Sequence, residues 1–281
     1  MIRFALMIAV TGSICACSSP EDVDERLMVA QTSASSASTS ASASGANSSA
    51  TATSRTSEGG LSVSVENDQY QFEYSFGGEA GSEPKLREIL EARLDAAQDE
   101  VKSQSAEAKQ DAATNDYPFR QHFLEVNWQV VADLPQMLSL SANIASYSGG
   151  AHGNSGFDGL VWDRKNAKAL KMADFFVSEK AMSAALAPSY CPALNKIRSE
   201  KRGIPVDPNS GDSFDTCPKM SELTILPGSS NGKTFNRIGL LAGPYVAGSY
   251  AEGPYEVTVP MNAAIMAAVK PAYAEFFSSG Q

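Results

Sequence analysis

Alternation of apolar and polar side chains predicts a series of β-strands along this chain. Leu61, Val63 and Val65 alternate with polar residues, and a second alternating run begins after the turn dipeptide Asn67-Asp68. A period of two gives a strand one apolar face, so two such runs joined by a turn predict a hairpin. The predicted strands are 61–66, 70–76, 124–130, 138–144, 157–161, 223–226, 238–241 and 255–259.

Helical periodicity appears between and after these runs. From about Pro84, apolar residues recur on one stripe formed by Ile89, Leu90, Leu94, Ala97 and Val101. Proline fits the first turn of a helix because its missing N–H has no partner there in any case. Further helices are expected at 173–176, at 179–186 and from 261 to about 277. Interspersed strands and helices, with short turns between successive strands, predict an α+β fold with a mostly antiparallel sheet and packed helices.

The first sixteen residues have the pattern of an export signal. Arg3 precedes a continuous apolar run, 4–10, that is too short to span a bilayer, since a spanning helix needs about 20 apolar residues. The sequence Ile14-Cys15-Ala16-Cys17 resembles a bacterial lipobox, and this resemblance implies lipidation of Cys17. The alternative is an ordinary secretory signal with an incidental cysteine.

We therefore expect a lipoprotein signal peptide at 1–16 and a chain anchored to the bilayer through Cys17. The expected location is the cell envelope, at the outer membrane facing the periplasm if the cell has two membranes. A flexible, disordered tether is expected at 17–60, because 23 of the 26 residues in 32–57 are Ser, Ala or Thr. Such a segment has no large apolar side chain to offset the entropy of ordering.

Two cysteines, Cys191 and Cys217, lie beyond the signal and the lipidation site. In the oxidising compartment of an exported chain, two remaining cysteines usually pair, so a disulfide is expected. It would enclose residues 192–216 and add about 3 kcal/mol by the chain-entropy argument. A redox pair is less favoured because there is no Cys-x-x-Cys spacing, and two thiols are an insufficient set of metal ligands.

The chain is acidic, with 22 basic against 32 acidic residues and a net charge of −10. This balance argues against a nucleic-acid partner, because such proteins need a basic surface to displace counterions. It suits a cationic partner through long-range electrostatic steering.

Two glycine-rich stretches with aromatic residues, 147–154 and 243–260, contain the candidate binding residues. His152 has two interpretations: an imidazole that contacts a ligand or acts as a general base, or a side chain that bonds the turn backbone and packs near Tyr147. The tyrosines could form a stacking platform for glycan or fill a sheet face. The candidates are His152, Asn154, Tyr147, Tyr245, Tyr250 and Tyr255.

At these residues the sequence resembles a known family. The stretch Tyr-x-Gly-Gly-Ala-His-x-Asn at 147–154, the run 173–176 and the ending Gly-Pro-Tyr-Glu-Val-Thr-Val-Pro at 253–260 are similar to a bacterial extracytoplasmic domain of unknown function. That domain is shared by the anti-sigma factor RsiV and the non-catalytic part of the peptidoglycan deacetylase PdaC. The resemblance implies an α+β fold with a PdaC-like sub-region at 61–133 and an RsiV-like sub-region at 134–281. In the anti-sigma factor the domain binds lysozyme.

The catalysis of the deacetylase relatives does not carry over. Their separate catalytic domain holds a metal with Asp and paired His, whereas the only histidines here are His122 and His152, so no metal and no cofactor is expected. The sequence predicts a non-catalytic lipoprotein of the cell envelope that binds peptidoglycan or a cationic, lysozyme-like protein. The alternative is a cell-wall glycan hydrolase or deacetylase-type enzyme that uses His152 with Asp158 or Asp174.

Overall fold

The computed structural model describes residues 50–55 and 59–280. The predicted signal peptide, Cys17 and residues 17–49 of the predicted tether lie outside the described residues. None of the helices in the described part of the chain combines the length and the apolar character that a bilayer crossing requires.

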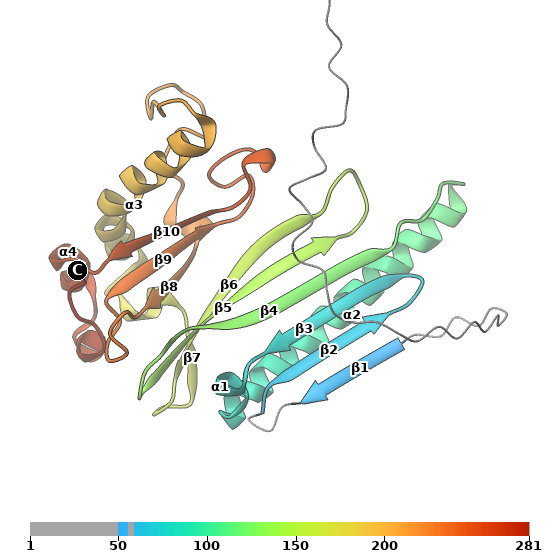
Figure 1. The fold of residues 1–281 in the computed structure, drawn as a ribbon, viewed down its shortest axis with the longest axis horizontal. Coiled ribbons are helices and arrows are strands. Elements are labelled where there is room, and N and C mark those ends of the chain that lie inside the picture. Colours follow the sequence, from blue (N-terminus) through green and yellow to red (C-terminus); the bar gives the residue numbers. More distant parts are fainter. Residues whose placement is uncertain (1–49, 56–58, 281) are drawn as a thin grey trace, which may run out of the picture. The chain divides into compact units, whose positions relative to one another are not determined.

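A seven-stranded sheet carries the first half of the described chain, with its strands in sequence order (Figure 1). Neighbouring strands are antiparallel except β3 and β4, which are parallel. The chain can return in the same direction because α1 and α2 connect these two strands, and a parallel pair needs such a crossover. The elements are β1 (Ala50–Arg55), β2 (Leu61–Glu66), β3 (Tyr70–Phe76), α1 (Gly78–Gly81), α2 (Pro84–Thr114), β4 (His122–Asp133), β5 (Met137–Tyr147), β6 (Asn154–Asp163) and β7 (Lys168–Leu170).

The first hydrophobic core lies between α2 and this sheet. The helix α2 begins at Pro84, as the sequence predicted, and Glu83 is its N-cap. The buried stripe of α2 packs with the alternate apolar residues of β2 and β3. The core includes Leu61, Val63, Val65, Phe72, Tyr74, Phe76, Leu86, Leu90, Leu94 and Val101.

The strand β1 corrects one expectation, because residues 50–55 belong to the segment predicted to be a disordered tether. They pair with β2 in antiparallel register, from Ala50 opposite Glu66 to Arg55 opposite Leu61. Backbone hydrogen bonds hold an edge strand without apolar side chains, and residues 51–55 are all exposed. Arg55 adds an ion pair with Glu91 of α2 at 2.7 Å. The side-chain pattern gave no signal for a strand held in this way.

The predicted sub-region boundary between residues 133 and 134 falls inside the hairpin formed by β4 and β5. These two strands pair along their length, with one irregularity between Val130 and Ala132. The seven-stranded sheet therefore runs continuously across the expected boundary.

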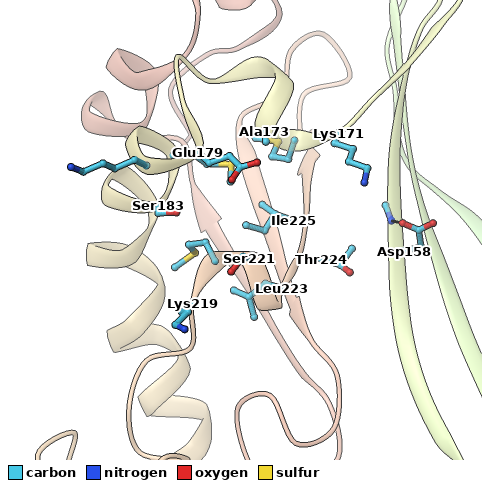
Figure 2. Close-up of a pocket in the computed structure, with 15 residues that line it drawn as sticks. Asp158, Lys171, Ala173, Glu179, Ser183, Lys219, Ser221, Leu223, Thr224 and Ile225 are labelled. Carbon is cyan, nitrogen blue, oxygen red and sulfur yellow. Dashed lines mark hydrogen bonds between the residues drawn. The ribbon is translucent and has the colours of Figure 1, made fainter.

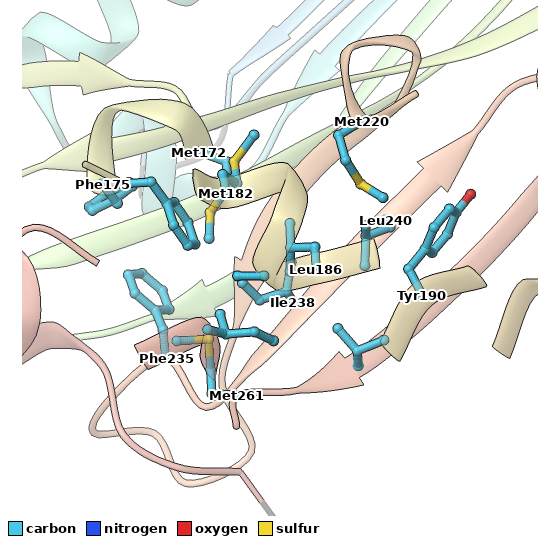
Figure 3. Close-up of a cluster of buried hydrophobic side chains, with 14 of the residues drawn as sticks. Met172, Phe175, Met182, Leu186, Tyr190, Met220, Phe235, Ile238, Leu240 and Met261 are labelled. Atoms are coloured by element: carbon cyan, nitrogen blue, oxygen red, sulfur yellow. The ribbon is translucent and has the colours of Figure 1, made fainter. Parts of the chain in front are cut away.

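A second, three-stranded antiparallel sheet follows, with strand order β10-β9-β8. Its own core is formed with α3 and the C-terminal segments, and large side chains such as Phe175, Leu186 and Phe235 are completely buried there (Figure 3). The elements are η1 (Met172–Phe175), α3 (Glu179–Arg202), η2 (Met220–Glu222), β8 (Thr224–Gly228), β9 (Arg237–Ala242), η3 (Tyr250–Glu252), β10 (Tyr255–Pro260), α4 (Ala263–Ala268) and η4 (Pro271–Phe276). The predicted α+β class with a mostly antiparallel sheet and packed helices is confirmed.

Two helix lengths differ from prediction. The helix expected at 179–186 continues to Arg202 through Pro188 and Pro192. Both prolines are exposed, so the carbonyls that lose their helical donors can meet water, while the opposite face of α3 is buried. The single helix expected from 261 to about 277 is instead α4 and the 3-10 helix η4, because Pro271 holds Lys270 in an extended conformation.

Close approach of the two sheets depends on Gly159 of β6. A Cβ built on Gly159 would lie 3.1 Å from Cγ2 of Thr224, tighter than ordinary van der Waals contact. The Thr224 hydroxyl donates to the carbonyl of Phe157 at 2.9 Å. Because β8 therefore lies directly on β6, loops far apart in sequence can meet.

Candidate functional site

His152, Tyr245 and Tyr250 form a cluster of three rings at the protein surface, here called the three-ring cluster. The His152 and Tyr250 rings stack with their centroids 3.8 Å apart and an interplanar angle of 25°. Tyr245 lies beside both, 6.4 Å from the ring of His152 and 5.7 Å from that of Tyr250. Two motifs separated by more than ninety residues in the chain thus supply one site.

Each motif lies in a loop at the end of a hairpin. His152 belongs to the β5–β6 loop, residues 148–153, in which Gly149 and Gly150 have φ of +95° and +91°. Tyr245 and Tyr250 belong to the β9–β10 loop, residues 243–254. The two loops meet because β9 leads to Gly243, where a Cβ would lie 3.5 Å from the carbonyl oxygen of Ser155.

Hydrogen bonds define the tautomer of His152. Its Nδ1 is 2.8 Å from the carbonyl oxygen of Gly153, an acceptor only, so Nδ1 carries the proton and donates. The Nε2 atom is then the acceptor for the Tyr245 hydroxyl at 3.4 Å. The Tyr250 hydroxyl donates to the same Gly153 carbonyl at 2.9 Å. Both ring nitrogens of His152 are therefore engaged within the cluster.

A carboxylate, Glu252, holds the turn that carries Tyr250. It accepts hydrogen bonds from Nε of Arg202 at 2.7 Å, from the Ser249 backbone N–H at 2.9 Å and from the Tyr255 hydroxyl. Burial by itself raises the pKa of Glu252, but hydrogen bonds from Tyr255, Arg202 and Ser249 outweigh it and lower the pKa to about 2. Only glycine fits at position 248, where a Cβ would lie 2.7 Å from Oε2 of Glu252.

The C-terminal end of α3 supports the β9–β10 loop further. The ammonium of Lys201 donates to the carbonyls of Glu252 and Pro254 and lies 4.0 Å from the ring centroid of Tyr255. Arg198 is completely buried and donates to the carbonyl of Ala247 at 2.7 Å. It also donates to the carbonyls of Asp215 and Thr216, next to the disulfide between Cys191 and Cys217.

The other predicted residues do not join the three-ring cluster. Tyr147 stacks on Phe123 and its hydroxyl receives a hydrogen bond from Arg120, so His152 packs on Tyr250 and not near Tyr147 as expected. The Asn154 side chain accepts from the backbone N–H of Ser155 and gives His152 no support. Tyr255 is buried and belongs to the network of Glu252.

Neither carboxylate considered as a catalytic partner contacts His152. Asp158 pairs with Arg93 at 2.8 Å, and Asp174 accepts from the backbone N–H of Lys171. Asp158 instead lines a cavity of about 670 Å³ between β6 and the second sheet, opposite Thr224 and Leu223 (Figure 2). Among the described residues, no group of three or more His, Cys, Asp or Glu side chains is placed to hold a metal ion.

Sequence reasoning missed Arg120, Arg198, Arg202 and Glu252. Arg120 donates to the Gly150 carbonyl at 3.1 Å and so holds the β5–β6 loop. Charged residues in loops and helices carry no pattern that distinguishes a structural partner from a solvated side chain. Only the Tyr-Ala-Glu sequence before Gly253 could have indicated a turn closed by its own carboxylate.

Residues 63–155 match the model of the protein family described as deacetylase PdaC. The match runs from β2 into the start of β6 and includes His152, but it ends before Tyr245 and Tyr250. The predicted resemblance to a PdaC-like extracytoplasmic domain is thereby confirmed, and such a domain points to the cell envelope. No curated protein matches the chain.

Two solved structures are also similar. One is a DUF3298 family protein from Pseudomonas aeruginosa PAO1, with 16% identity, 84% of this chain and 99% of that chain covered, and a TM-score of 0.47. The other is a member of the same family from Bacteroides fragilis NCTC 9343, with 15% identity, 76% and 89% covered, and a TM-score of 0.42.

Proposed function

With a PdaC-like domain at residues 63–155 as the premise, we propose that this protein is a non-catalytic binding module of the cell envelope, anchored through lipid on Cys17. We propose that its three-ring cluster contacts the glycan of peptidoglycan. The observation that carries the proposal is the convergence of His152, Tyr245 and Tyr250, from two distant loops, on one surface site.

The conformation of Tyr245 supports a binding role. Its side chain is 55% exposed, and its backbone φ of +67° lies in the left-handed region, which is unfavourable for a bulky residue. Glycine would avoid this strain, and strained backbone of this kind clusters at ligand sites, which supports a role of the phenol ring in binding. Tyrosine gives a large amphipathic contact area at low entropic cost because it has few rotatable bonds.

The hydrogen bonds of His152 favour contact over catalysis. A general base needs an accessible lone pair, yet the Nε2 lone pair of His152 receives the Tyr245 hydroxyl. In the competing enzyme hypothesis, Asp158 or Asp174 would have to orient the imidazole, and both have other partners.

Co-sedimentation with purified sacculi tests the binding role. We expect His152→Ala, Tyr245→Gly and Tyr250→Ala each to weaken binding about tenfold, in the range for residues central to an interface. Tyr245→Gly is the decisive variant, because it removes the ring and also relieves the left-handed backbone. Its free energy of unfolding should stay within about 1 kcal/mol of the wild type, since relief of strain offsets the flexibility of glycine.

Val177→Ala is the matched control, because Val177 is an equally exposed apolar residue in the segment before α3. Sacculus binding that survives all three cluster substitutions would contradict the proposal. Release of soluble product from sacculi that disappears in His152→Ala would instead favour the enzyme.

A cationic, lysozyme-like protein is the second candidate partner, favoured by the net charge of −10. Steering by net charge weakens with ionic strength because salt screens exposed charges beyond about 10 Å at 0.1 M. Retention on immobilised lysozyme, with an association rate that falls steeply with salt, would support this partner. Retention on lysozyme but not on sacculi would show that the ligand is a lysozyme-like protein and not peptidoglycan.

Mass spectrometry of the mature N-terminus tests the anchor. A lipid-modified cysteine at position 17 is expected, and an unmodified terminus or a start at another residue would refute the anchor without affecting the binding site.

A further inference from the structure

A second cavity, of about 570 Å³, borders the same β5–β6 loop. It is formed by one residue of α2, by the segment that leads into β4, and by residues 148–151 of the loop. Its charged or titratable lining residues are Tyr117, Arg120 and His122, and no carboxylate is among the lining residues in the described part of the chain. In a chain with ten more acidic than basic residues, such a lining favours an anionic ligand.

Two nitrogen atoms of the Arg120 guanidinium, Nε and Nη2, are not engaged in hydrogen bonds with the described residues. Its Nη1 donates to the Tyr147 hydroxyl at 3.3 Å and to the Gly150 carbonyl at 3.1 Å, which fixes the guanidinium beside the cavity. Within the described residues, no acceptor lies within hydrogen-bond range of its Nε and Nη2. A planar guanidinium with one edge unengaged matches the geometry of a carboxylate.

His122 supplies a second donor. The residue is 3% exposed, and its Nδ1 is buried with no hydrogen-bond partner among the described residues. A buried N–H without an acceptor is more costly than a bare lone pair, so the proton resides on Nε2. His122 lines the cavity, and its Nε2 is not among the buried side-chain atoms that lack a partner.

The backbone of the β5–β6 loop adds further hydrogen-bond donors, which favour an anion as Arg120 does. Gly149 and Gly150 both have positive φ, and their missing side chains leave open space on that side. In the described structure, no acceptor meets the N–H groups of Gly149, Gly150 or Ala151. These backbone N–H groups are further unengaged donors at the border of the cavity.

We propose that this cavity binds the carboxylate of an acidic saccharide, between Arg120, His122 and the β5–β6 loop. The proposal rests on the proposed function and sharpens it, because it selects saccharides that carry a carboxylate over neutral ones. The cavity volume falls within the range of small-ligand sites, about 300–1,000 Å³, and the half-exposed ring of Tyr117 and the ring of Phe119 give the sugar an apolar wall. The Tyr117 hydroxyl is already engaged with Asp111, which is not a lining residue.

A matched pair of ligands tests the proposal. The disaccharide of N-acetylglucosamine and N-acetylmuramic acid carries a lactyl carboxylate, and N,N′-diacetylchitobiose lacks only that lactyl group. Calorimetric titration of the full chain should give an affinity about tenfold higher for the acidic disaccharide, as expected for one charge-assisted bidentate contact. The disaccharide with an L-Ala-D-Glu stem, in which the lactyl carboxylate is amidated, shows whether a stem carboxylate serves equally well.

Arg120→Gln should abolish the preference for the acidic disaccharide. Because Arg120 also holds the β5–β6 loop, the quantity to measure is the ratio of the two affinities and not either affinity alone. Lys85→Gln removes a positive charge from the exposed surface of α2 and should leave the preference intact, which controls for net charge. Tyr147→Phe removes one acceptor of Arg120 but keeps the charge, and it should reduce the preference about twofold at most. Nitrogen NMR of His122 should show Nε2 protonated and shifted by the acidic disaccharide alone.

The outcomes separate the two proposals. Equal affinity for both disaccharides, or a preference that survives Arg120→Gln, overturns the carboxylate site while the three-ring cluster can still bind glycan. No binding of either disaccharide, together with no retention on sacculi, overturns both.

Discussion

The two loops that meet in the three-ring cluster are held in different ways. The β9–β10 loop is tied to α3 by charged side chains, through Glu252, Arg202, Lys201 and the buried Arg198. The β5–β6 loop is held by Arg120 and by the Tyr250 hydroxyl, which donates to Gly153. One half of the candidate site is therefore rigidly supported, and the other half has the backbone freedom of adjacent glycines.

This difference suggests that the two loops have different roles in binding. A rigid tyrosine turn presents ring surface at little entropic cost, while a glycine-rich loop can adjust to a ligand and close on it. The contrast makes the β9–β10 loop directly sensitive to changes in α3 and the disulfide, whereas the β5–β6 loop feels them only through the Tyr250 hydroxyl. The predictions below test that asymmetry.

The largest effect is expected from Arg198→Met. Methionine roughly fills the space but leaves the carbonyls of Ala247, Asp215 and Thr216 without a donor, so the free energy of unfolding should fall by about 4 kcal/mol. Chemical denaturation measures it. Lys196→Met, two residues away and exposed, should change the value by less than about 0.5 kcal/mol because its ion pair with Glu200 is solvated. A loss below 1 kcal/mol for Arg198→Met would show that the buried arginine does not hold the loop.

Replacement of Cys191 and Cys217 by serine should lower the free energy of unfolding by about 3 kcal/mol, because the unfolded chain regains the entropy of an open loop. Hydrogen exchange should accelerate more in the β9–β10 loop than in the β5–β6 loop. Equal acceleration in both loops would contradict their separate support.

Glu252→Gln should lower the free energy of unfolding by about 2 kcal/mol at neutral pH, since Arg202 loses a charged acceptor. The folded-state pKa of Glu252, about 2, lies below its ordinary value of 4.5. Its stabilisation is therefore full above pH 4.5 and lost as the pH falls towards 2. Denaturation of both proteins across that range should show the difference between them shrinking. A difference that does not change with pH would exclude ionised Glu252 as its source.

The smallest effect is expected from Tyr250→Phe, which removes one hydrogen bond to the Gly153 carbonyl and keeps the ring stacked on His152. The loss should be about 1 kcal/mol. Faster hydrogen exchange in residues 148–153 is the diagnostic measurement, and unchanged exchange there would mean that this hydroxyl does not restrain the loop.

Much of the fold follows from local pattern. The hairpin of β2 and β3 and the start of α2 at Pro84 lie where alternation and helix signals predicted them. Prediction was wrong where tertiary contacts override the local signal. The buried face of α3 carries the helix past Pro188 and Pro192, and backbone pairing with β2 orders β1 although its described side chains are exposed.

The candidate site shows the same limit. His152, Tyr245 and Tyr250 could be selected from the sequence because glycine-rich aromatic stretches are unusual, but Asn154, Tyr147 and Tyr255 were selected by the same rule and have other roles. Selection from glycine-rich aromatic stretches uses composition alone. Membership of the three-ring cluster depends on which side chains face the other loop.

The sequence by itself determined most of the element types, though not β1 or the break between α4 and η4, together with the two motifs and the acidic charge. These depend on neighbours along the chain and on simple counts. Only the tertiary structure decided that His152 stacks on Tyr250 and that Arg120 and His122 line one cavity whose described lining residues include no carboxylate. The His152–Tyr250 stack depends on the close approach of β6 to Thr224 at Gly159 and to Gly243 at Ser155, and the cavity depends on α2, the segment before β4 and the β5–β6 loop coming together. No local periodicity encodes contacts between segments so far apart in the chain.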